Sequence, residues 1–137
     1  MTYQIWKEQN FTAAELLNAA VSGPEIDLDN DGLNTVLEYA LGLNPKISDA
    51  SVGYSASFTQ AGGNDYLAMT LRRQKNAIDL TYKVQVDDTL QSWTETTAAV
   101  GIPTDNADGT ETITIRDTVS LTNGKKRFIR LQVTLSE

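Results

Sequence analysis

The chain has 137 residues, a net charge of −7, and neither histidine nor cysteine. Without cysteine it has no disulfide, thiol nucleophile or zinc–thiolate site, and without histidine it lacks the commonest general base and transition-metal ligand. The charge is uneven: residues 1–50 hold two basic and eight acidic residues, a balance of −6, whereas residues 51–137 hold nine and ten, a balance of −1. This composition argues against nucleic acid as a partner, and no apolar stretch is long enough to insert into a membrane.

The first segment of the chain has the signals of short helices. Residues 3–9 form one predicted helix, and Trp6 is expected to pack this part of the chain onto the rest. Thr12 can cap a second helix over residues 13–20, because Glu15 three positions later completes a capping box. A glycine–proline pair then ends that helix.

An acidic loop follows, and residues 27–38 (DLDNDGLNTVLE) fit the calcium-loop pattern D-x-[DN]-x-[DN]-G-x5-E at every specified position. Ca²⁺ takes about six to eight oxygen ligands, which this spacing supplies from three carboxylates, a carbonyl after the sharp turn at Gly32, and a bidentate glutamate in the next helix. Thr35 can add a hydroxyl ligand or hold a water. The predicted ligands are Asp27, Asp29, Asp31, the carbonyl of Leu33, and Glu38. The alternative is a solvated acidic turn that caps a helix.

A helix is predicted directly after the loop, over residues 33–41, because the apolar residues there recur at helical spacing on one face. Gly42 is placed to end this helix, and Pro45 follows shortly after it. No second stretch of the chain matches the loop pattern. The site is therefore expected to be solitary, in contrast to the paired loops of EF-hand proteins.

From about residue 52 the pattern changes to short alternating stretches separated by turn residues. About five to seven such strands, including a hairpin around the turn at residues 62–65, predict an antiparallel β-sandwich. The stretches are 54–58, 66–72, 80–86, 110–116 and 127–135, with a short edge segment at 92–94. The expected fold class is mainly β with a small α cap. Residues 1–50 would form the helical cap with the loop, and residues 51–137 the sandwich, packed together as one module.

Candidate ligand-binding side chains lie among the aromatic and basic residues of the strands. Exposed aromatic rings can stack on sugar rings, and basic clusters at residues 72–75 and 125–127 can meet a sulfated or carboxylated polysaccharide. The candidates are Trp93, Tyr54, Tyr66, Arg72 and Arg73. The alternative is that the rings fill the core and the charges are ordinary solvated turn residues.

A catalytic role is not expected. Two carboxylate pairs, Asp87 with Asp88 and Asp105 with Asp108, have the residue type that a glycosidase places across its cleft. Both pairs lie at predicted turns, where the backbone favours aspartate. Most nucleophile–base arrangements also need the missing histidine or cysteine. A small hydrolase is therefore the weakest of the functional alternatives.

Taken together, these segments resemble a module found at the C-terminal ends of large exported proteins of environmental bacteria. Such modules begin with a helix containing Trp or Phe, continue with a stretch of the type SGP…DxDxDGLxNxLEYALGxxP, and end in a β-rich domain. The matching residues here are 22–24, 27–45, 80–86, 90–93 and 125–131. Asp87 departs from the pattern, which often has a serine there. The last stretch, KKRFIRL, resembles a closing RRFLRL strand. The loop by itself is similar to the calcium loops of dockerins and thrombospondin type 3 repeats.

The resemblance implies calcium as the cofactor, export to the medium or the cell surface, and attachment to a larger polypeptide. The expected function is that of a non-catalytic accessory module that binds polysaccharide, neutral or anionic, for a parent multidomain enzyme. The alternative is a structural, anchoring or sorting domain at the bacterial cell surface. A second calcium site of dispersed ligands in the sandwich stays open, with Asp49, Asp65 and Asp105 as contributors.

Overall fold

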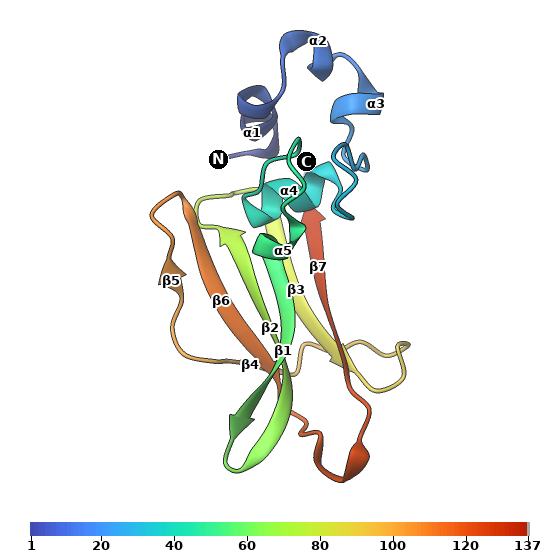
Figure 1. Cartoon of the computed structure of the whole chain (residues 1–137), viewed down its shortest axis with the longest axis vertical. Coiled ribbons are helices and arrows are strands. Elements are labelled where there is room, and N and C mark those ends of the chain that lie inside the picture. The colour runs from blue at the N-terminus through green and yellow to red at the C-terminus, as the bar shows by residue number, and fades with distance from the viewer. Residues whose placement is uncertain (137) are drawn as a thin grey trace.

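Two antiparallel β-sheets and a cap of short helices make up the chain, with the helices gathered at one end of the strands (Figure 1). The computed structural model describes residues 1–136. Within these residues no helix combines the length and apolarity needed to cross a membrane. The helices are α1 (Tyr3–Asn10), α2 (Ala13–Leu16), α3 (Ala19–Ser22), α4 (Thr35–Leu41) and α5 (Ala50–Gly53), with a short 3-10 turn η1 (Thr122–Gly124).

The larger sheet has the strand order β1-β2-β6-β4, with β5 also pairing with β6, and the smaller sheet consists of β3 and β7. The strands are β1 (Tyr54–Ala61), β2 (Asn64–Gln74), β3 (Leu80–Asp87), β4 (Thr97–Ala99), β5 (Thr104–Asp105), β6 (Thr110–Asp117) and β7 (Phe128–Leu135). All pairings are antiparallel. The predicted fold class, an antiparallel β-sandwich with a small helical part, is confirmed.

The β1–β2 hairpin turns at the glycine pair expected from the sequence. Gly62 and Gly63 have φ of 58° and 81°, and Ala61 pairs directly with Asn64. A two-residue turn with positive φ at both central positions matches the right-handed twist of the strands, and glycine adopts this conformation without steric cost. The resulting register decides which residues of β1 and β2 face the smaller sheet.

Most helix ends in the cap lie where the sequence signals predict them, but the helix predicted after Thr12 is interrupted. Thr12 accepts a hydrogen bond from the N–H of Glu15, whose carboxylate accepts one from the N–H of Thr12, so the capping box is confirmed. The single helix predicted over residues 13–20 is wrong, because α2 and α3 replace it. Asn18 causes the break: its side chain accepts from the N–H of Ala20 and starts the second helix as its N-cap.

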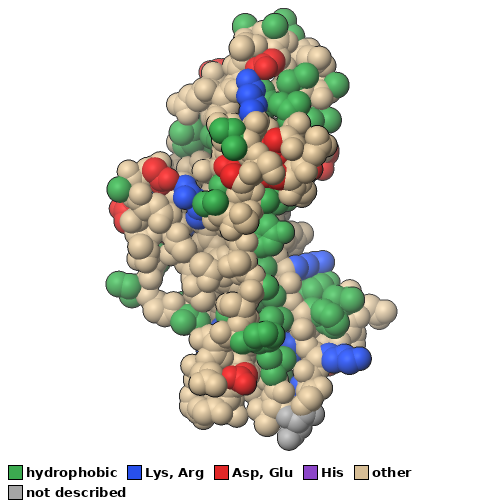
Figure 2. Space-filling view, in the orientation of Figure 1, with side chains coloured by type: hydrophobic (Ala, Val, Ile, Leu, Met, Phe, Trp, Pro, Cys, Tyr) green, Lys and Arg blue, Asp and Glu red, His purple; other side chains and the backbone are tan. Residues whose placement is uncertain are grey.

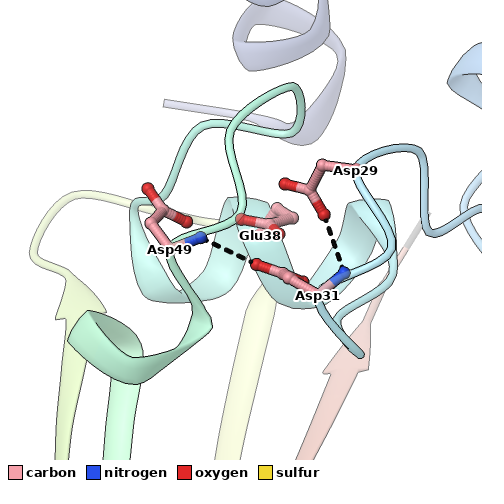
Figure 3. A group of neighbouring side chains, drawn as sticks. All are labelled: Asp29, Asp31, Glu38 and Asp49. Carbon is pink, nitrogen blue, oxygen red and sulfur yellow. Dashed lines mark hydrogen bonds between the residues drawn. The ribbon is translucent and has the colours of Figure 1, made fainter.

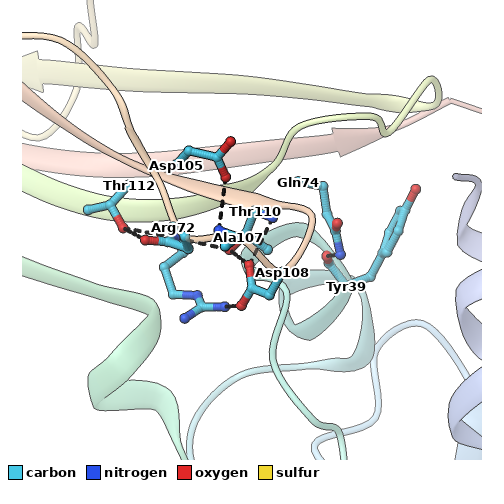
Figure 4. A network of polar contacts seen from close by, with 9 residues as sticks. Tyr39, Arg72, Gln74, Asp105, Ala107, Asp108, Thr110 and Thr112 are labelled. Carbon is cyan, nitrogen blue, oxygen red and sulfur yellow. Dashed lines mark hydrogen bonds and ion pairs between the residues drawn. The ribbon is translucent and has the colours of Figure 1, made fainter.

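Helix α4 links the cap to the sheets. Asn34 caps it by accepting a hydrogen bond from the N–H of Leu37, and Gly42 ends it with a φ of 66° in the left-handed region. Residues 39–41 are fully buried. Strand side chains satisfy two carbonyls at the end of the helix. The Tyr82 hydroxyl donates to the carbonyl of Ala40 over 2.6 Å. The Gln74 side chain donates to the carbonyl of Tyr39 over 3.1 Å (Figure 4).

Two apolar clusters hold the molecule together. The cluster between the sheets contains Leu33, Leu41, Leu43, Met69, Leu71, Val84 and Ile113. The second cluster is aromatic and joins α1 to α4 through Tyr3, Trp6, Phe11 and Tyr39. The ring centroids of Trp6 and Tyr39 are 5.5 Å apart, and Leu80 and Leu135 of the smaller sheet pack against the cluster. Trp6 therefore packs the cap onto the sheets, as expected.

Two short strands, β4 and β5, have no counterpart in the sequence prediction. Both lie beside β6, where β4 pairs with residues 115–117 and β5 with residues 111–112. Conversely, the edge segment predicted at residues 92–94 makes only an isolated bridge between Val86 and Thr94. A strand of two or three residues carries too little alternation to be recognised, because only its neighbour defines it.

Candidate metal centre

The acidic loop lies between α3 and α4 and turns through two residues in the left-handed region. Asn30 has a φ of 63° and Gly32 a φ of 95°. Asparagine and glycine adopt this conformation at low cost, so the chain can reverse sharply among its aspartates. The turn brings these aspartates toward the first turn of α4, which carries Glu38 (Figure 3).

The three aspartates of the loop bind its backbone and hold its shape. Asp27 accepts hydrogen bonds from the N–H groups of Asp31 and Gly32, over 3.1 and 2.9 Å. Asp29 accepts from the N–H of Asp31, and Asp31 accepts from the N–H of Leu33. These bonds occupy both oxygens of Asp27 but only one oxygen of Asp29.

Four carboxylates from three segments converge beside this turn: Asp29 and Asp31 of the loop, Glu38 of α4, and Asp49 at the N-cap of α5 (Figure 3). Each presents an oxygen, and these oxygens lie within 4.8 Å of one another. The N–H of Asp49 also donates to Asp31 Oδ2 over 3.1 Å. Because α5 leads directly into β1, the group connects the cap to the larger sheet.

Several oxygens of this group are buried and have no hydrogen-bond partner. They are Asp29 Oδ2, both carboxylate oxygens of Glu38, and Asp49 Oδ1. Glu38 as a whole is only 1% exposed. A buried acceptor left without a partner costs about 1–3 kcal/mol, and more when it is charged. Buried carboxylate oxygens gathered in one place match the ligands of a hard cation, so this cluster could hold a metal ion.

Without a cation the electrostatics of the cluster are unfavourable. Burial, together with the charges of Asp31, Asp29 and Asp49, raises the pKa of Glu38 from its ordinary value of 4.5 to about 9. Burial also raises the pKa of Asp29. Either a bound proton or a bound cation relieves this repulsion.

The metal-free protein is therefore expected to lose stability as the pH rises from about 5 to about 9. Because the pKa of Glu38 is about 9 in the folded state and near 4.5 in the unfolded chain, the folded state keeps a proton that the unfolded chain has lost. Each rise in pH within this window favours unfolding. Thermal melts in chelator should show a falling melting temperature, and Glu38→Gln should flatten the curve. A melting temperature that rises across the window would contradict this assignment.

The five predicted ligands occupy different environments. Asp29, Asp31 and Glu38 belong to the converging group. Asp27 is a neighbour in the loop whose two oxygens accept from backbone N–H groups. Leu33 directs its side chain into the core between the sheets, and its N–H donates to Asp31. The loop pattern thus leads to three of the four converging carboxylates.

The fourth carboxylate, Asp49, lies outside the loop pattern, and the sequence suggests it only for a separate second site. The chain reverses after α4 at Gly42 and passes Pro45, which brings Asp49 back to the loop. An acidic residue shortly after such a reversal is the only signal that points to it. Thr35, considered as an extra ligand, instead donates its hydroxyl to the carbonyl of Ile26 over 2.9 Å, which fixes the loop to the helix.

Four residues of the predicted basic clusters are paired with neighbouring acids. The pairs are Arg72–Asp108, Arg73–Glu111, Lys75–Asp105 and Arg127–Asp117, with N–O distances of 2.6–2.7 Å. The first of them joins β2 to the turn before β6 (Figure 4). A cation that is already paired offers less attraction to an anionic polysaccharide. Lys125 and Lys126, before β7, are exposed.

The three predicted aromatic candidates lie on different faces of the molecule. The Arg116 guanidinium covers the Tyr66 ring at 4.2 Å on the outer face of the larger sheet. The Arg130 guanidinium lies 4.2 Å from the Trp93 ring on the outer face of the smaller sheet. Tyr54 stands at the edge strand β1 and faces the space between the sheets. These rings do not form a continuous stacking surface.

Three of the four carboxylates considered for catalysis, those of Asp87, Asp105 and Asp108, accept hydrogen bonds from the backbone of turns. Hydrogen bonds from the backbone, with that of Ser92 the strongest, lower the pKa of Asp87. The Thr110 hydroxyl and other donors lower the pKa of Asp108 to about 2. A general acid needs a pKa near the operating pH, so carboxylates held ionised in this way do not suit that role.

Comparison of the chain with protein-family models, with curated proteins and with solved structures finds no match.

Proposed function

We propose that the chain is a non-catalytic calcium-binding module that serves a structural or anchoring role within a larger exported protein. The observation that carries this proposal is the set of buried, unpartnered carboxylate oxygens on Asp29, Glu38 and Asp49. Export and the larger parent protein rest on the sequence resemblance. The ion would be held by Asp29, Asp31, Glu38 and Asp49, with Asp27 and the Leu33 carbonyl as the further ligands of the loop pattern.

Calcium suits this group of ligands better than other common ions. The donors are all oxygen, and the chain has no histidine or cysteine to attract a softer metal. Mg²⁺ usually keeps several waters and takes one or two carboxylates, whereas Ca²⁺ accepts about six to eight oxygens in a flexible shell. Four converging carboxylates therefore favour calcium.

The role proposed for the ion is to fasten three segments together. Its ligands come from the loop, from α4 and from the start of α5, immediately before β1. A bound ion would therefore hold the cap in its orientation on the larger sheet. An ion that binds the folded chain and not the unfolded chain stabilises the fold by about 2.7 kcal/mol at 100 times its dissociation constant.

The structural or anchoring role has more support than polysaccharide binding. The aromatic candidates lie on separate faces, and salt bridges engage Arg72 and Arg73. Affinity electrophoresis against neutral, sulfated and uronic polysaccharides separates the two roles. No retardation by any of them supports the structural role, and retardation that disappears in chelator would restore the binding role and tie it to calcium.

Asp49→Asn is expected to weaken calcium binding at least tenfold while leaving the fold intact in chelator. The substitution removes one charged ligand but keeps a side chain of the same shape. Titration calorimetry with calcium measures the effect, and Asp88→Asn, which removes an exposed carboxylate from the β3 end of the sandwich, is the matched control. Unchanged calcium affinity in the Asp49 variant would contradict the four-carboxylate site. No calcium binding by the wild-type protein would overturn the proposed function.

A further inference from the structure

Strand β1 is an open edge of the larger sheet. Among the described residues it pairs only with β2, so its other edge has no backbone partner. The smaller sheet does not cover it, because β7 lies over β2 and α4. A groove of about 300 Å³ opens between Tyr54 and Met69 on one side and Ile129 and Leu131 of β7 on the other.

The face of β1 that points toward the smaller sheet is apolar and exposed. Tyr54, Ala56 and Phe58 pair with Leu71, Met69 and Leu67 of β2. Directly paired residues share a face, and Met69 and Leu71 are core residues, so the three β1 side chains point inward. Tyr54 is nevertheless 43% exposed and Phe58 70% exposed. Hydrophobic side chains gather along β1 in the space-filling view (Figure 2).

The edge lacks the usual protection against pairing. Natural edge strands carry lysine, proline or bulges that block the approach of another strand. The eight residues of β1, YSASFTQA, contain no charge and no proline. Its pairing with β2 runs without a bulge from Tyr54 to Ala61. The strand is therefore competent to accept another strand.

The segment YSASF reads the same in both directions by chemical type: aromatic, serine, alanine, serine, aromatic. We propose that β1 pairs antiparallel with β1 of a second copy of this chain, about a two-fold axis at Ala56. In that register Tyr54 lies opposite the partner's Phe58 on the inward face, and Ser55 lies opposite the partner's Ser57 on the outward face. Cross-strand aromatic pairs stabilise such ladders, and a two-fold axis uses the same patch on both copies.

The ends of the two copies carry complementary charge in this arrangement. Antiparallel pairing brings the β1–β2 turn of each copy toward the other copy's cap, whose residues 1–50 have a balance of −6. Two hydrogen bonds hold the segment before Lys125 and Lys126 against that turn. The N–H of Leu121 donates to the carbonyl of Asp65, and the Thr122 hydroxyl donates to the Asn64 side chain. Two exposed lysines of one copy thus approach the acidic cap of the other.

The size of the patch predicts a weak dimer. An aromatic side chain buries about 200 Å² when it is fully covered. The Tyr54 and Phe58 rings of the two copies are partly covered already, so dimerisation would bury roughly 450 Å² of their surface. This area lies below the roughly 1,200 Å² typical of stable complexes. The remaining binding free energy would come from the backbone hydrogen bonds between the two strands and from the charged ends. A dissociation constant on the order of 10 µM is expected.

Sedimentation velocity in calcium, from about 1 µM to about 500 µM protein, tests the association. The wild-type protein should shift from monomer to dimer across this range. Ala56→Lys, which places two like charges together at the axis, should raise the dissociation constant at least tenfold. The matched control is Gln132→Lys, at an exposed position of β7, and it should dimerise as the wild type does. A wild-type protein that stays monomeric throughout, with β1 left for another occupant, would overturn the proposal.

Cysteine cross-linking tests the register, because the chain has no cysteine of its own. Across an antiparallel pair the Cα atoms of two facing residues are about 4.5–5.5 Å apart, within disulfide range. Ala56→Cys should therefore form a covalent dimer under mild oxidation. Ser55→Cys should react much more slowly, because residue 55 of the second copy is a diagonal neighbour about 7–8 Å away. Gln132→Cys lies away from β1 and should not react. Equal rates for all three variants would overturn the proposal.

Discussion

Glu38→Gln is expected to change stability in opposite directions with and without calcium. In calcium the wild-type protein should melt on the order of 10 °C higher than in chelator. Bound calcium would stabilise the fold by about 2.7 kcal/mol, and each kcal/mol shifts the melting temperature of a chain of this size by several degrees. The variant should lose most of this difference. In chelator near neutral pH, however, the variant should melt higher than the wild type.

The opposite signs follow from the burial of Glu38. Its two carboxylate oxygens have no hydrogen-bond partner, and three other carboxylates converge on the same place. Without an ion and near neutral pH, the folded chain keeps a proton on Glu38 that the unfolded chain has released, and this difference costs stability. Replacing the carboxyl group with a neutral amide removes that cost. With an ion the same charge is a ligand, and the amide donates less electron density to calcium than a bidentate carboxylate does.

Scanning calorimetry of four samples measures this effect: wild type and variant, each in calcium and in chelator. Glu25→Gln is the matched control, since Glu25 is an exposed glutamate of the same acidic segment. It should follow the wild type in both buffers. A Glu38→Gln protein that keeps the full calcium-dependent shift would contradict the assignment of this residue as a ligand.

Asp117→Ala is expected to lower the free energy of unfolding by about 3–5 kcal/mol, because it removes one partner of a buried ion pair in the sandwich. Asp117 is 0% exposed and accepts two hydrogen bonds from Arg127, over 2.6 Å from Nε and 3.1 Å from Nη2. It also accepts from the N–H of Val119. The substitution leaves the Arg127 guanidinium, whose side chain is only 10% exposed, without its counter-charge, which costs far more than the lost bonds themselves.

Chemical denaturation of Asp117→Ala, compared with Asp105→Ala, tests this prediction. Asp105 pairs with Lys75 at the surface, so its loss should change stability very little. A second variant, Asp117→Leu combined with Arg127→Met, removes both charges and should recover much of the lost stability. If the two single variants are equally stable, the buried pair does not have the importance assigned to it.

Local signals in the sequence predict much of this fold correctly. The capping box at Thr12, the left-handed glycine after α4 and the glycine turn of the β1–β2 hairpin each depend on a few neighbouring residues, and the structure contains all three. The acidic loop is recognised in the same way, since its spacing lies within twelve residues. The break between α2 and α3 is not predicted by the helical pattern, because the Asn18 side chain competes with the helix for backbone N–H groups.

The members of the candidate site that come from elsewhere in the chain could not be predicted in this way. Asp49 has no motif of its own, and it meets Asp31 only because the chain reverses after α4. The sequence suggests that the two arginines of the expected ligand patch are available to an anionic ligand. In the folded chain, β-sheet register and turn packing place an acidic side chain beside each of them.

Residue spacing along one continuous segment is enough to predict the acidic loop, the helix ends and the mainly antiparallel β class. Contacts between distant segments are needed to show that a fourth carboxylate joins the loop, that the aromatic candidates lie apart, and that β1 is left as an uncovered edge. The physical reason is that these properties depend on which distant segments come into contact. Those contacts are set by the packing of the whole chain and leave no local pattern.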